Sequence, residues 1–357
     1  MDVVVITGSA GSIGSESVDF FSKKFDLVVG IDNNTRQTLF GSEGSVIWNQ
    51  KRLEDSIINY RHYHADIRNY QNLESIFREY SSDIKLVVHT AAQPSHDWAT
   101  LEPLTDFAIN ANGTLNVLEI TRLLCPDAVF IFTSTNKVYG DQPEHLPLVE
   151  LETRWEIDKN HRFFTEGIDE SMSIDYTNHT LFGASKLAAD IVAQEYGRHF
   201  GMKVGVFRCG CLTGPKHSGV ELHGFLSYLM KCAFTGRNYT ICGHKGKQVR
   251  DNIHSYDLVN MFWHFYQNPQ RGEVYHAGGG RFVNCSMKEA IVLCEEITSQ
   301  KMHYSYSENS RVADVRWWIS DVSKFKRHYP DWNLSYGIKD ILLQIYGSMT
   351  KRLAQKT

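Results

Sequence analysis

The chain has 357 residues, of which 42% are hydrophobic and 22% charged, so it can bury the core of one large domain or of two coupled domains. Its formal net charge of −4 gives no electrostatic reason to expect a nucleic acid or an anionic membrane as its partner. Seven cysteines without regular spacing predict reduced thiols in a cytoplasmic protein. The 16 histidines follow no metal-ligand spacing, so no metal site is expected. No apolar run reaches the roughly 18 residues that a membrane-spanning helix needs.

Strand-like and helix-like segments alternate along the first 208 residues. Runs of β-branched residues are typical of strands that are buried on both faces, and apolar residues with helical spacing are typical of helices. In chain order, the pattern predicts a strand at 3–7, a helix at 13–24, a strand at 27–31, a helix at 70–81, a strand at 84–88, a helix at 112–124, a strand at 128–132, a helix at 180–200 and a strand at 204–208. This alternation predicts a Rossmann-type, doubly wound parallel α/β sheet.

A glycine-rich turn follows the first predicted strand. Gly8, Gly11 and Gly14 form a G-x-x-G-x-x-G pattern, with Ser12 and Ile13 between the last two glycines. Glycine at these places permits a tight turn and a close approach of the backbone to a pyrophosphate, which the helix N-terminus then binds. The turn could also be a glycine-rich connection without a ligand, but its place between a buried strand and a helix favours dinucleotide binding.

Two acidic residues follow the next strand-like segments. Asp32 ends the second strand, where a carboxylate accepts hydrogen bonds from the adenosine ribose and repels a 2′-phosphate. This favours NAD over NADP, although Arg36 lies close enough to weaken the preference, and Asp32 could instead be a simple strand-end cap. Asp66 and Ile67 follow a third strand-like segment, in a place suited to contact with the adenine.

The chain beyond these motifs becomes less regular. Residues 141–180 are irregular, polar and aromatic, and a stretch of this length without regular structure is usually functional. We expect a dinucleotide-binding domain of residues 1–208, to which 249–280 return. Residues 209–248 and 281–357 are expected to form a smaller mixed α/β lobe that binds the substrate.

Several segments together resemble the extended short-chain dehydrogenase/reductases, and among them the nucleotide-sugar epimerases and dehydratases. They are the glycine turn, Asp32-Asn33, Asp66-Ile67, residues 89–93, 110–114 and 133–140, and Ser185-Lys186. The resemblance covers nearly the whole chain. Residues 134–141, 152–154, 169–171 and 246–251 are similar to the group of CDP-paratose (CDP-tyvelose) 2-epimerases.

The resemblance implies roles for particular residues. Lys186 would bind the nicotinamide ribose, Thr135 would hold a sugar hydroxyl, and Arg250 would bind the substrate diphosphate with Arg311, unless these arginines form structural ion pairs. The implied NAD-binding residues are Gly8, Gly11, Ser12, Ile13, Gly14, Asp32, Asn33, Asp66, Ile67, Ala91, Ala92, Gln93, Asn110, Thr133 and Lys186. The implied nucleotide-sugar-binding residues are His96, Asn136, Arg208, Cys209, Arg250 and Arg311.

Residues 135–137 argue against a 4,6-dehydratase. The resembling segment of those enzymes carries Thr-Asp-Glu, and its two acids eliminate water, whereas this chain has Asn136 and Lys137. An amide and an ammonium group cannot replace a pair of carboxylates as general acid and base.

The catalytic Tyr-x-x-x-Lys pair of the resembled family is incomplete here, because Phe182 stands four residues before Lys186. The phenylalanine could be an engineered change, a natural variant that uses another base, or a mark of lost catalysis; the intact surroundings favour the second explanation. Candidate replacements for the phenol are Tyr176, His179, His96, Asp97, Cys209 and Cys211. Each could instead be structural, as a helix cap, a substrate-binding residue or a packing residue.

The resemblance implies an epimerase, with C2 of a CDP-hexose as the reacting carbon. NAD would take a hydride from the sugar to give a transient ketone and return it to the other face. Another NAD-dependent nucleotide-sugar dehydrogenase or decarboxylase, or a non-catalytic NAD- or nucleotide-sugar-binding protein, remains an alternative. The resemblance also implies a homodimer or higher homo-oligomer, with the helices at 112–124 and 180–200 at the interface.

Overall fold

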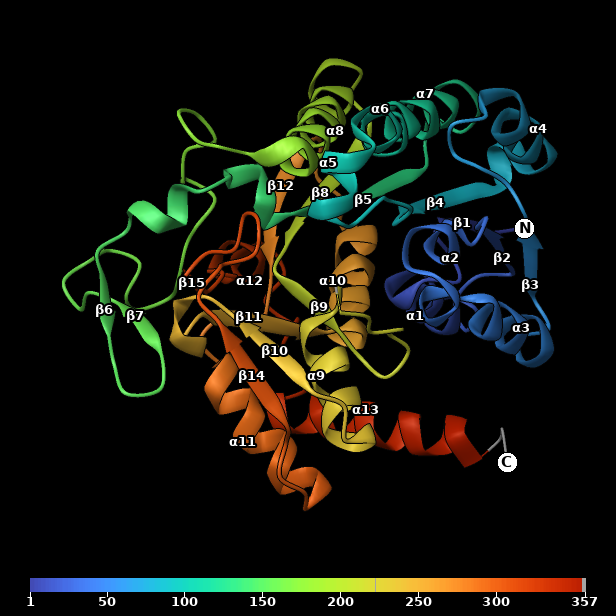
Figure 1. Cartoon of the computed structure of the whole chain (residues 1–357). Coiled ribbons are helices and arrows are strands. Elements are labelled where there is room, and N and C mark those ends of the chain that lie inside the picture. Colours follow the sequence, from blue (N-terminus) through green and yellow to red (C-terminus); the bar gives the residue numbers. More distant parts are fainter. Residues whose placement is uncertain (222, 355–357) are drawn as a thin grey trace. The chain divides into compact units, whose positions relative to one another are not determined.

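The computed structural model describes residues 1–221 and 223–354, which fall into two units (Figure 1). Unit 1 comprises Met1–Val138, Thr180–Arg208 and Leu258–Tyr275. Unit 2 comprises Tyr139–His179, Cys209–Asp257 and the described residues from His276 onward. The chain therefore crosses between the units several times.

A seven-stranded sheet is the centre of unit 1, in the order β12-β8-β5-β4-β1-β2-β3. Its strands are β1 Val3–Thr7, β2 Leu27–Ile31, β3 Tyr60–Tyr63, β4 Ile84–His89, β5 Val129–Thr135, β8 Lys203–Cys209 and β12 Glu273–Ala277. The last residue of β8 and the last two residues of β12 belong to unit 2. Parallel pairing joins β1 to β2 and β4, β2 to β3, and β4 to β5. The predicted Rossmann-type parallel fold is confirmed.

The strand order reverses beside β1, because β2 pairs with one edge of β1 and β4 with the other. In open parallel sheets, ligands bind at the carboxyl ends of the strands at such a reversal. The loops that follow β1 and β4 therefore form the expected cofactor end of the sheet.

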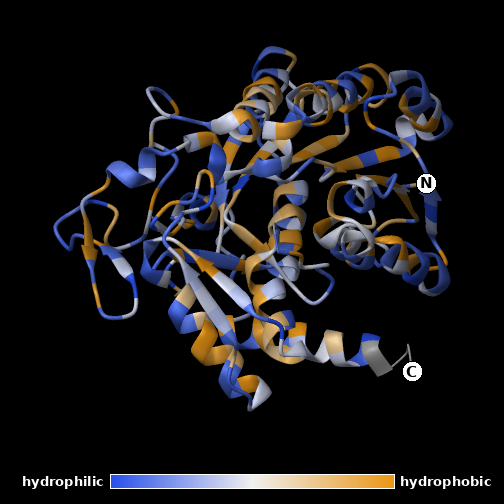
Figure 2. Ribbon diagram, viewed as in Figure 1, coloured by the Kyte–Doolittle hydropathy of each residue, from blue (hydrophilic) through white to orange (hydrophobic). Residues whose placement is uncertain are grey.

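Helices pack on the sheet of unit 1, and Figure 1 shows α7 and α8 on one side of it and α1 on the other. The helices are α1 Ser12–Phe21, α2 Thr35–Phe40, α3 Ile47–Ser56, α4 Tyr70–Tyr80, α5 His96–Leu101, α6 Pro103–Phe107, the π-helix Ala108–Asn112, α7 Gly113–Leu124, α8 Thr180–His199 and α10 Ser255–Gln267, which begins in unit 2. Short 3₁₀ helices are Ser42–Gly44, Ser81–Asp83 and Asn136–Tyr139. The strands β1, β2, β4 and β5 are hydrophobic along most of their length (Figure 2) and are buried, because both of their faces are covered.

Unit 2 contains shorter elements. Its strands are β6 Leu148–Glu150, β7 Trp155–Ile157, β9 Cys211–Thr213, β10 Tyr239–Cys242, β11 Val249–His254, β13 Asn284–Ser286, β14 Tyr304–Ser307 and β15 Trp317–Trp318. Its helices are α9 Phe225–Thr235, α11 Met287–Thr298, α12 Ser323–His328 and α13 Ile338–Ala354, with 3₁₀ helices Gln142–His145 and His244–Gly246. Apolar side chains of α9, α11 and α13 form a common core.

The boundaries of these units differ from the domain boundaries that were expected from the sequence. Residues 139–179 join unit 2, where Trp155 N donates to Lys247 O at 2.8 Å. Residues 249–257 also belong to unit 2, because β11 pairs with β9, β13 and β15. Only 258–275 of the expected returning segment lie in unit 1.

Candidate active site

The glycine turn after β1 is too tight for any side chain at two of its positions. Gly8 has a φ of 69°, and a Cβ on it would lie 2.8 Å from Ala91 N in the loop that follows β4. A Cβ on Gly14 would lie only 2.0 Å from Gly8 O. The turn therefore needs glycine for its own packing and leaves its backbone open to a close approach by a ligand.

The start of α1 carries unused hydrogen-bonding capacity. Gly11 is the N-cap residue, and no side chain caps the helix there. The hydroxyl of Ser12 is buried without a hydrogen-bond partner among the described residues, and the backbone of Ile13 and Gly14 continues the first turn. An orphaned hydroxyl beside uncapped N–H groups fits the pyrophosphate of a dinucleotide.

The carboxylate of Asp32, directly after β2, holds this turn. Its Oδ2 accepts a hydrogen bond from Ala10 N at 3.0 Å and its Oδ1 accepts one from Asn34 N at 2.7 Å. Each carboxylate oxygen retains capacity for a second bond, as a ribose hydroxyl would require. Arg36 lies in the same region, where burial lowers the pKa of its guanidinium to about 10 despite the charge of Asp32.

A cavity of about 470 Å³ lies in unit 1, and Asn33 and Asp66 are among the residues that line it. Asn33 Nδ2 donates to Asp66 Oδ2 at 3.1 Å, and Arg68 forms a bidentate ion pair with Asp66. Burial raises the pKa of Asp66, but the hydrogen bonds and charge of Arg68 outweigh it, so the pKa is lowered. The cavity is polar on this wall and has room for an adenine ring.

Ile67 is placed differently from Asp66. Its side chain is buried against α7, where a Cβ on Gly113 would lie 2.6 Å from Ile67 Cδ1. Asn116 Nδ2 donates to the carbonyl of Ile67 at 3.0 Å. The side chain of Ile67 therefore anchors the segment, and a contact of this residue with adenine would use its backbone.

The loop after β4 is fixed by a buried polar cluster. Ala91 and Ala92 are partly buried there, and Ala91 N donates to Thr7 Oγ1 at 3.3 Å. Asn110, in the π-helix, accepts a bond from Gln93 N at 2.9 Å and donates to Ser185 Oγ at 3.1 Å. This cluster ties the loop to α8.

Sequence reasoning missed a carboxylate in this cluster, that of Asp106. It accepts hydrogen bonds from Gln93 Nε2 at 2.7 Å and Asn110 Nδ2 at 3.0 Å, and burial raises its pKa. The four-residue spacing of Asp106 and Asn110 was the available signal, because residues so spaced share one helix face. Also missed was Asn49, whose Nδ2 donates to Ala10 O at 2.9 Å and so supports the glycine turn from α3.

Lys186 is a buried residue of α8, and its side chain reaches the end of β5 in unit 1. Its Nζ donates to Thr133 O at 2.9 Å and stands 4.4 Å from the centre of the Phe132 ring. Thr133 Oγ1 donates to His89 O at 2.9 Å, which joins the ends of β4 and β5. The ammonium group is thus held at the carboxyl end of the sheet.

Phe182 lies one helical turn before Lys186 on α8 and is buried. The ring of His96 meets it edge to face, with 4.6 Å between the ring centres. His96 Nδ1 is 3.1 Å from Thr180 Oγ1. The structure thus places the His96 ring in contact with Phe182.

Thr135 and Asn136 follow one another at the end of β5. Thr135 Oγ1 accepts a hydrogen bond from Lys137 N at 3.3 Å, and it is 3.4 Å from Asn136 Oδ1. Both residues are partly buried. Their short polar side chains lie next to the strand that supports Lys186.

Arg208 has a structural partner where the sequence analysis expected a substrate contact. Its Nη2 lies 2.8 Å from Asp190 Oδ1 and its Nε lies 3.0 Å from Asp190 Oδ2, with both side chains buried. Ser134 Oγ donates to the same carboxylate at 2.5 Å. A buried arginine needs such a paired and hydrogen-bonded anion, so Arg208 ties β8 to α8. Cys209, which follows it, is buried.

The two predicted diphosphate-binding arginines lie in unit 2 with different surroundings. Arg250 forms an ion pair with Asp314, and its Nη1 donates to Val249 O at 2.7 Å. Arg311 is exposed and donates to Glu221 O at 2.8 Å. Arg250 is therefore already paired, and an anion would have to share or displace Asp314.

The candidate bases before α8 are also in unit 2. Tyr176 is fully exposed and has a φ of 53°. His179 Nε2 is 2.9 Å from Ile174 O. His96, by contrast, lies in unit 1 and contacts the Phe182 ring.

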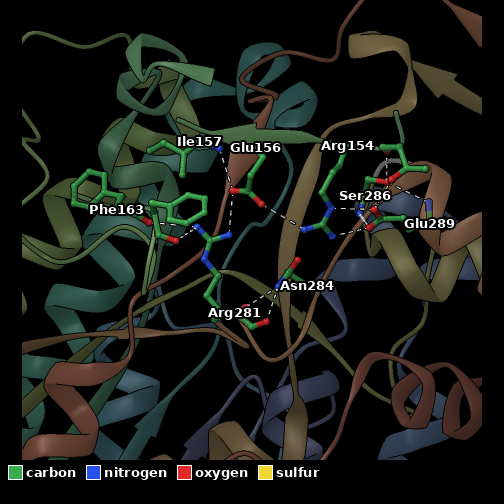
Figure 3. A network of polar contacts seen from close by, with 11 residues as sticks. Arg154, Glu156, Ile157, Phe163, Arg281, Asn284, Ser286 and Glu289 are labelled. Carbon is green, nitrogen blue, oxygen red and sulfur yellow. Dashed lines mark hydrogen bonds and ion pairs between the residues drawn. The ribbon is translucent and has the colours of Figure 1, made fainter. Parts of the chain in front are cut away.

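Two arginine–glutamate pairs fix the β6–β7 hairpin within unit 2 (Figure 3). Arg154 binds both carboxylate oxygens of Glu289, at 2.9 and 2.6 Å, and Arg281 Nη1 donates to Glu156 Oε1 at 3.0 Å. Glu289 also completes the capping box of α11 with Ser286. These residues have structural partners, so the 152–154 motif shapes unit 2.

The described part of the chain contains no group of three or more histidine, cysteine or acidic side chains that could hold a metal ion. None of the helices in residues 1–221 and 223–354 is long and apolar enough to cross a membrane.

The glycine turn, the acid after β2 and the strand reversal define a dinucleotide-binding α/β protein. Residues 4–278 match the family described as "NAD dependent epimerase/dehydratase family". The chain belongs to this family, which confirms the predicted family and its NAD cofactor.

Relatives in this family include both epimerases and dehydratases. The chain is 31% identical to a CDP-paratose 2-epimerase of Salmonella typhi, over 96% of this chain and 98% of the relative. It is 28% identical to a dTDP-glucose 4,6-dehydratase of Salmonella typhimurium, over 91% and 86%. The crystal structure of DesIV, a dTDP-glucose 4,6-dehydratase from Streptomyces venezuelae with NAD and TYD bound, has the same fold, with a TM-score of 0.79, 20% identity and coverage of 99% and 98%.

Proposed function

We propose that the chain is an NAD-dependent nucleotide-sugar epimerase that inverts C2 of a CDP-hexose. The observation that carries the proposal is the cradle of Gly8, Gly14 and the orphaned Ser12 hydroxyl, combined with Lys186 at the same end of the sheet. The CDP-hexose and the C2 position derive from the 31% identical relative, whose name is CDP-paratose 2-epimerase.

Direct deprotonation cannot invert this carbon, because a C–H bond next to a hydroxyl is far too weak an acid. Bound NAD supplies the alternative, a reversible acceptance of hydride from the sugar. The residues of the chain would bind and orient the reactants: Gly8, Ser12 and Gly14 the pyrophosphate, Asp32 the adenosine ribose, and Asn33 with Asp66 the adenine. Lys186 would bind the nicotinamide ribose and keep positive charge near the reacting hydroxyl.

Asn136 and Lys137 favour epimerisation over dehydration. Elimination of water needs a general acid and a general base at the sugar. An amide and an ammonium group occupy the two places after Thr135 instead. Thr135 would then hold a sugar hydroxyl without any elimination chemistry beside it.

Unit 2 would bind the rest of the substrate. Arg250 and Arg311 carry the charge for a diphosphate, and the planar guanidinium group matches phosphate oxygens well. Because Asp314 already pairs with Arg250, binding would exchange one anion for another. Arg311 is exposed and would add a second contact.

The chain would act as a homodimer or a higher homo-oligomer through α7 and α8. Both helices expose large apolar side chains, which are Leu115, Leu123, Leu181 and Ile191. Exposed apolar residues gathered on neighbouring helices mark interaction sites. Sedimentation should give a dimer that Leu123→Glu with Ile191→Glu converts to monomers.

The function is tested with purified protein and a CDP-hexose. We expect bound NAD to be released on denaturation and the C2 epimer to form without net NADH. Protein that contains no NAD and binds none in calorimetry would contradict the cofactor assignment. Stoichiometric formation of NADH would indicate a dehydrogenase. Ligand binding without any hydride exchange would indicate a non-catalytic binding protein, an alternative that the phenylalanine at position 182 favours.

A further inference from the structure

Phe182 leaves the epimerase reaction without an evident proton acceptor. Its phenyl ring has no titratable proton, although Lys186 remains one helical turn away on α8. Oxidation of a sugar hydroxyl releases a proton as well as a hydride, so another side chain must take that proton. A group that replaces the phenol must lie close to Phe182.

His96 is such a group. It begins α5, directly after the loop that follows β4, and its ring meets the Phe182 ring at 4.6 Å between centres. Histidine exchanges protons near neutral pH. The imidazole thus lies beside the place of the missing phenol and at the cofactor end of the sheet.

Thr180 contacts this imidazole and has a strained backbone conformation. Its φ is 60°, which is rare for a β-branched residue, and such strain is typical of functional sites. The strained turn brings Thr180 Oγ1 to 3.1 Å from His96 Nδ1. The same hydroxyl accepts a hydrogen bond from Gly183 N at 3.3 Å, which fixes it at the start of α8.

The His96–Thr180 bond suits both protonation states of the ring. A hydroxyl donates to Nδ1 when the imidazole is neutral and accepts from Nδ1–H when it is protonated. The ring therefore keeps its orientation while its charge changes. A general acid/base that must alternate during turnover needs this property.

Charged groups also stand on the elements that pack around His96. They are Asp97 on α5 itself, Asp106 on α6 and Lys186 on α8. The carboxylates favour the protonated imidazole, whereas the ammonium group opposes it.

We propose that His96, positioned by Thr180, is the catalytic acid/base that replaces the family's tyrosine. The inference rests on the proposed function. Oxidation of the sugar carbinol would break its C–H and O–H bonds. The hydride would pass to NAD⁺, which is the oxidant, the proton would pass to the imidazole, and the C–O single bond would become the C=O bond of a ketone. When the hydride returns to the other face, the imidazolium gives the proton back to the oxygen.

Kinetics of four variants test the proposal. His96→Gln should lower kcat by about 100-fold or more, the usual size of a general acid/base contribution, with NAD affinity in calorimetry unchanged. Imidazole in the buffer should restore part of this activity. Thr180→Val should lower kcat but not raise KM, Thr180→Ser should retain activity, and His199→Gln, exposed at the end of α8, should match the parent.

A second readout does not depend on turnover. In the NAD-loaded parent, the ¹⁵N signals of the His96 ring should titrate with pH and shift when CDP-glucose is added, and Thr180→Val should alter that titration. A His96→Gln protein that keeps kcat within about threefold of the parent overturns the proposal. If the parent turns over no CDP-hexose, the proposed function fails by itself, and a His96 signal that neither titrates nor responds to CDP-glucose then overturns the inference separately.

Discussion

His89 gives the sharpest prediction about stability. It ends β4 and is fully buried, with Nδ1 2.6 Å from Thr7 Oγ1 and Nε2 3.0 Å from Thr114 Oγ1. Burial, together with the positive charge of Lys186, lowers the pKa of His89 from 6.5 to about 3. We predict that His89→Gln makes the protein less sensitive to acid.

The size of the effect follows from the pKa difference. A histidine whose pKa is lowered by folding stays neutral in the folded state while the unfolded chain takes up a proton, so the stability falls as the pH falls below 6.5. The loss of unfolding free energy is about 2 kcal/mol between about pH 7 and about pH 5. It is about 4 kcal/mol at about pH 3 and approaches about 5 kcal/mol only well below that pH.

The assay is urea unfolding of the parent and of His89→Gln at the two pH values. Glutamine can still donate and accept between the two threonine hydroxyls, so the variant should fold, and its change of unfolding free energy with pH should be about 2 kcal/mol smaller. His199→Gln, an exposed histidine, is the control and should keep the parent's pH dependence. Equal pH dependence in the parent and in His89→Gln would refute the reasoning.

Three further predictions concern the cofactor turn and two buried acids. Gly14→Ala should weaken NAD binding in calorimetry by about tenfold or more, because its Cβ would lie 2.0 Å from Gly8 O. The control Gly347→Ala, on α13 with open space around it, should bind NAD normally and gain up to about 1 kcal/mol of stability. Asp190→Asn should cost about 3–5 kcal/mol in urea unfolding, because Arg208 would be left as a buried unpaired charge; a loss below about 1 kcal/mol would contradict this. Burial raises the pKa of Asp251 to about 6, so this group binds protons more tightly when folded and adds about 1 kcal/mol of stability as the pH falls from about 7 to about 5. Asp251→Asn should remove that gain, and an unchanged pH dependence would show that the carboxyl is not perturbed.

Local patterns were sufficient to predict much of unit 1. The apolar runs at Val3–Thr7 and Leu27–Ile31 are strands, and the glycine spacing identified the turn between β1 and α1. These features depend on neighbouring residues alone. The helices α2 and α3, which carry few apolar residues, gave no such periodic signal and were missed.

The candidate site was harder to predict, because its contacts join distant parts of the chain. His96 and Phe182 are 86 positions apart, and nothing in either segment indicates that their rings meet. Arg208 was expected at the substrate because its partner, Asp190, gave no sequence signal. The packing of distant segments determines whether a charged group faces a ligand or forms an ion pair in the interior. A short sequence motif does not contain that information.

The most direct test of the account follows the hydrogen on the reacting carbon. A CDP-hexose that carries deuterium at C2 is incubated with the protein in ordinary water, and the epimer is analysed by NMR and mass spectrometry. The account predicts that the epimer keeps the deuterium at C2, because NAD holds the hydride and returns it within one binding event. Replacement of the deuterium by solvent hydrogen would contradict the account.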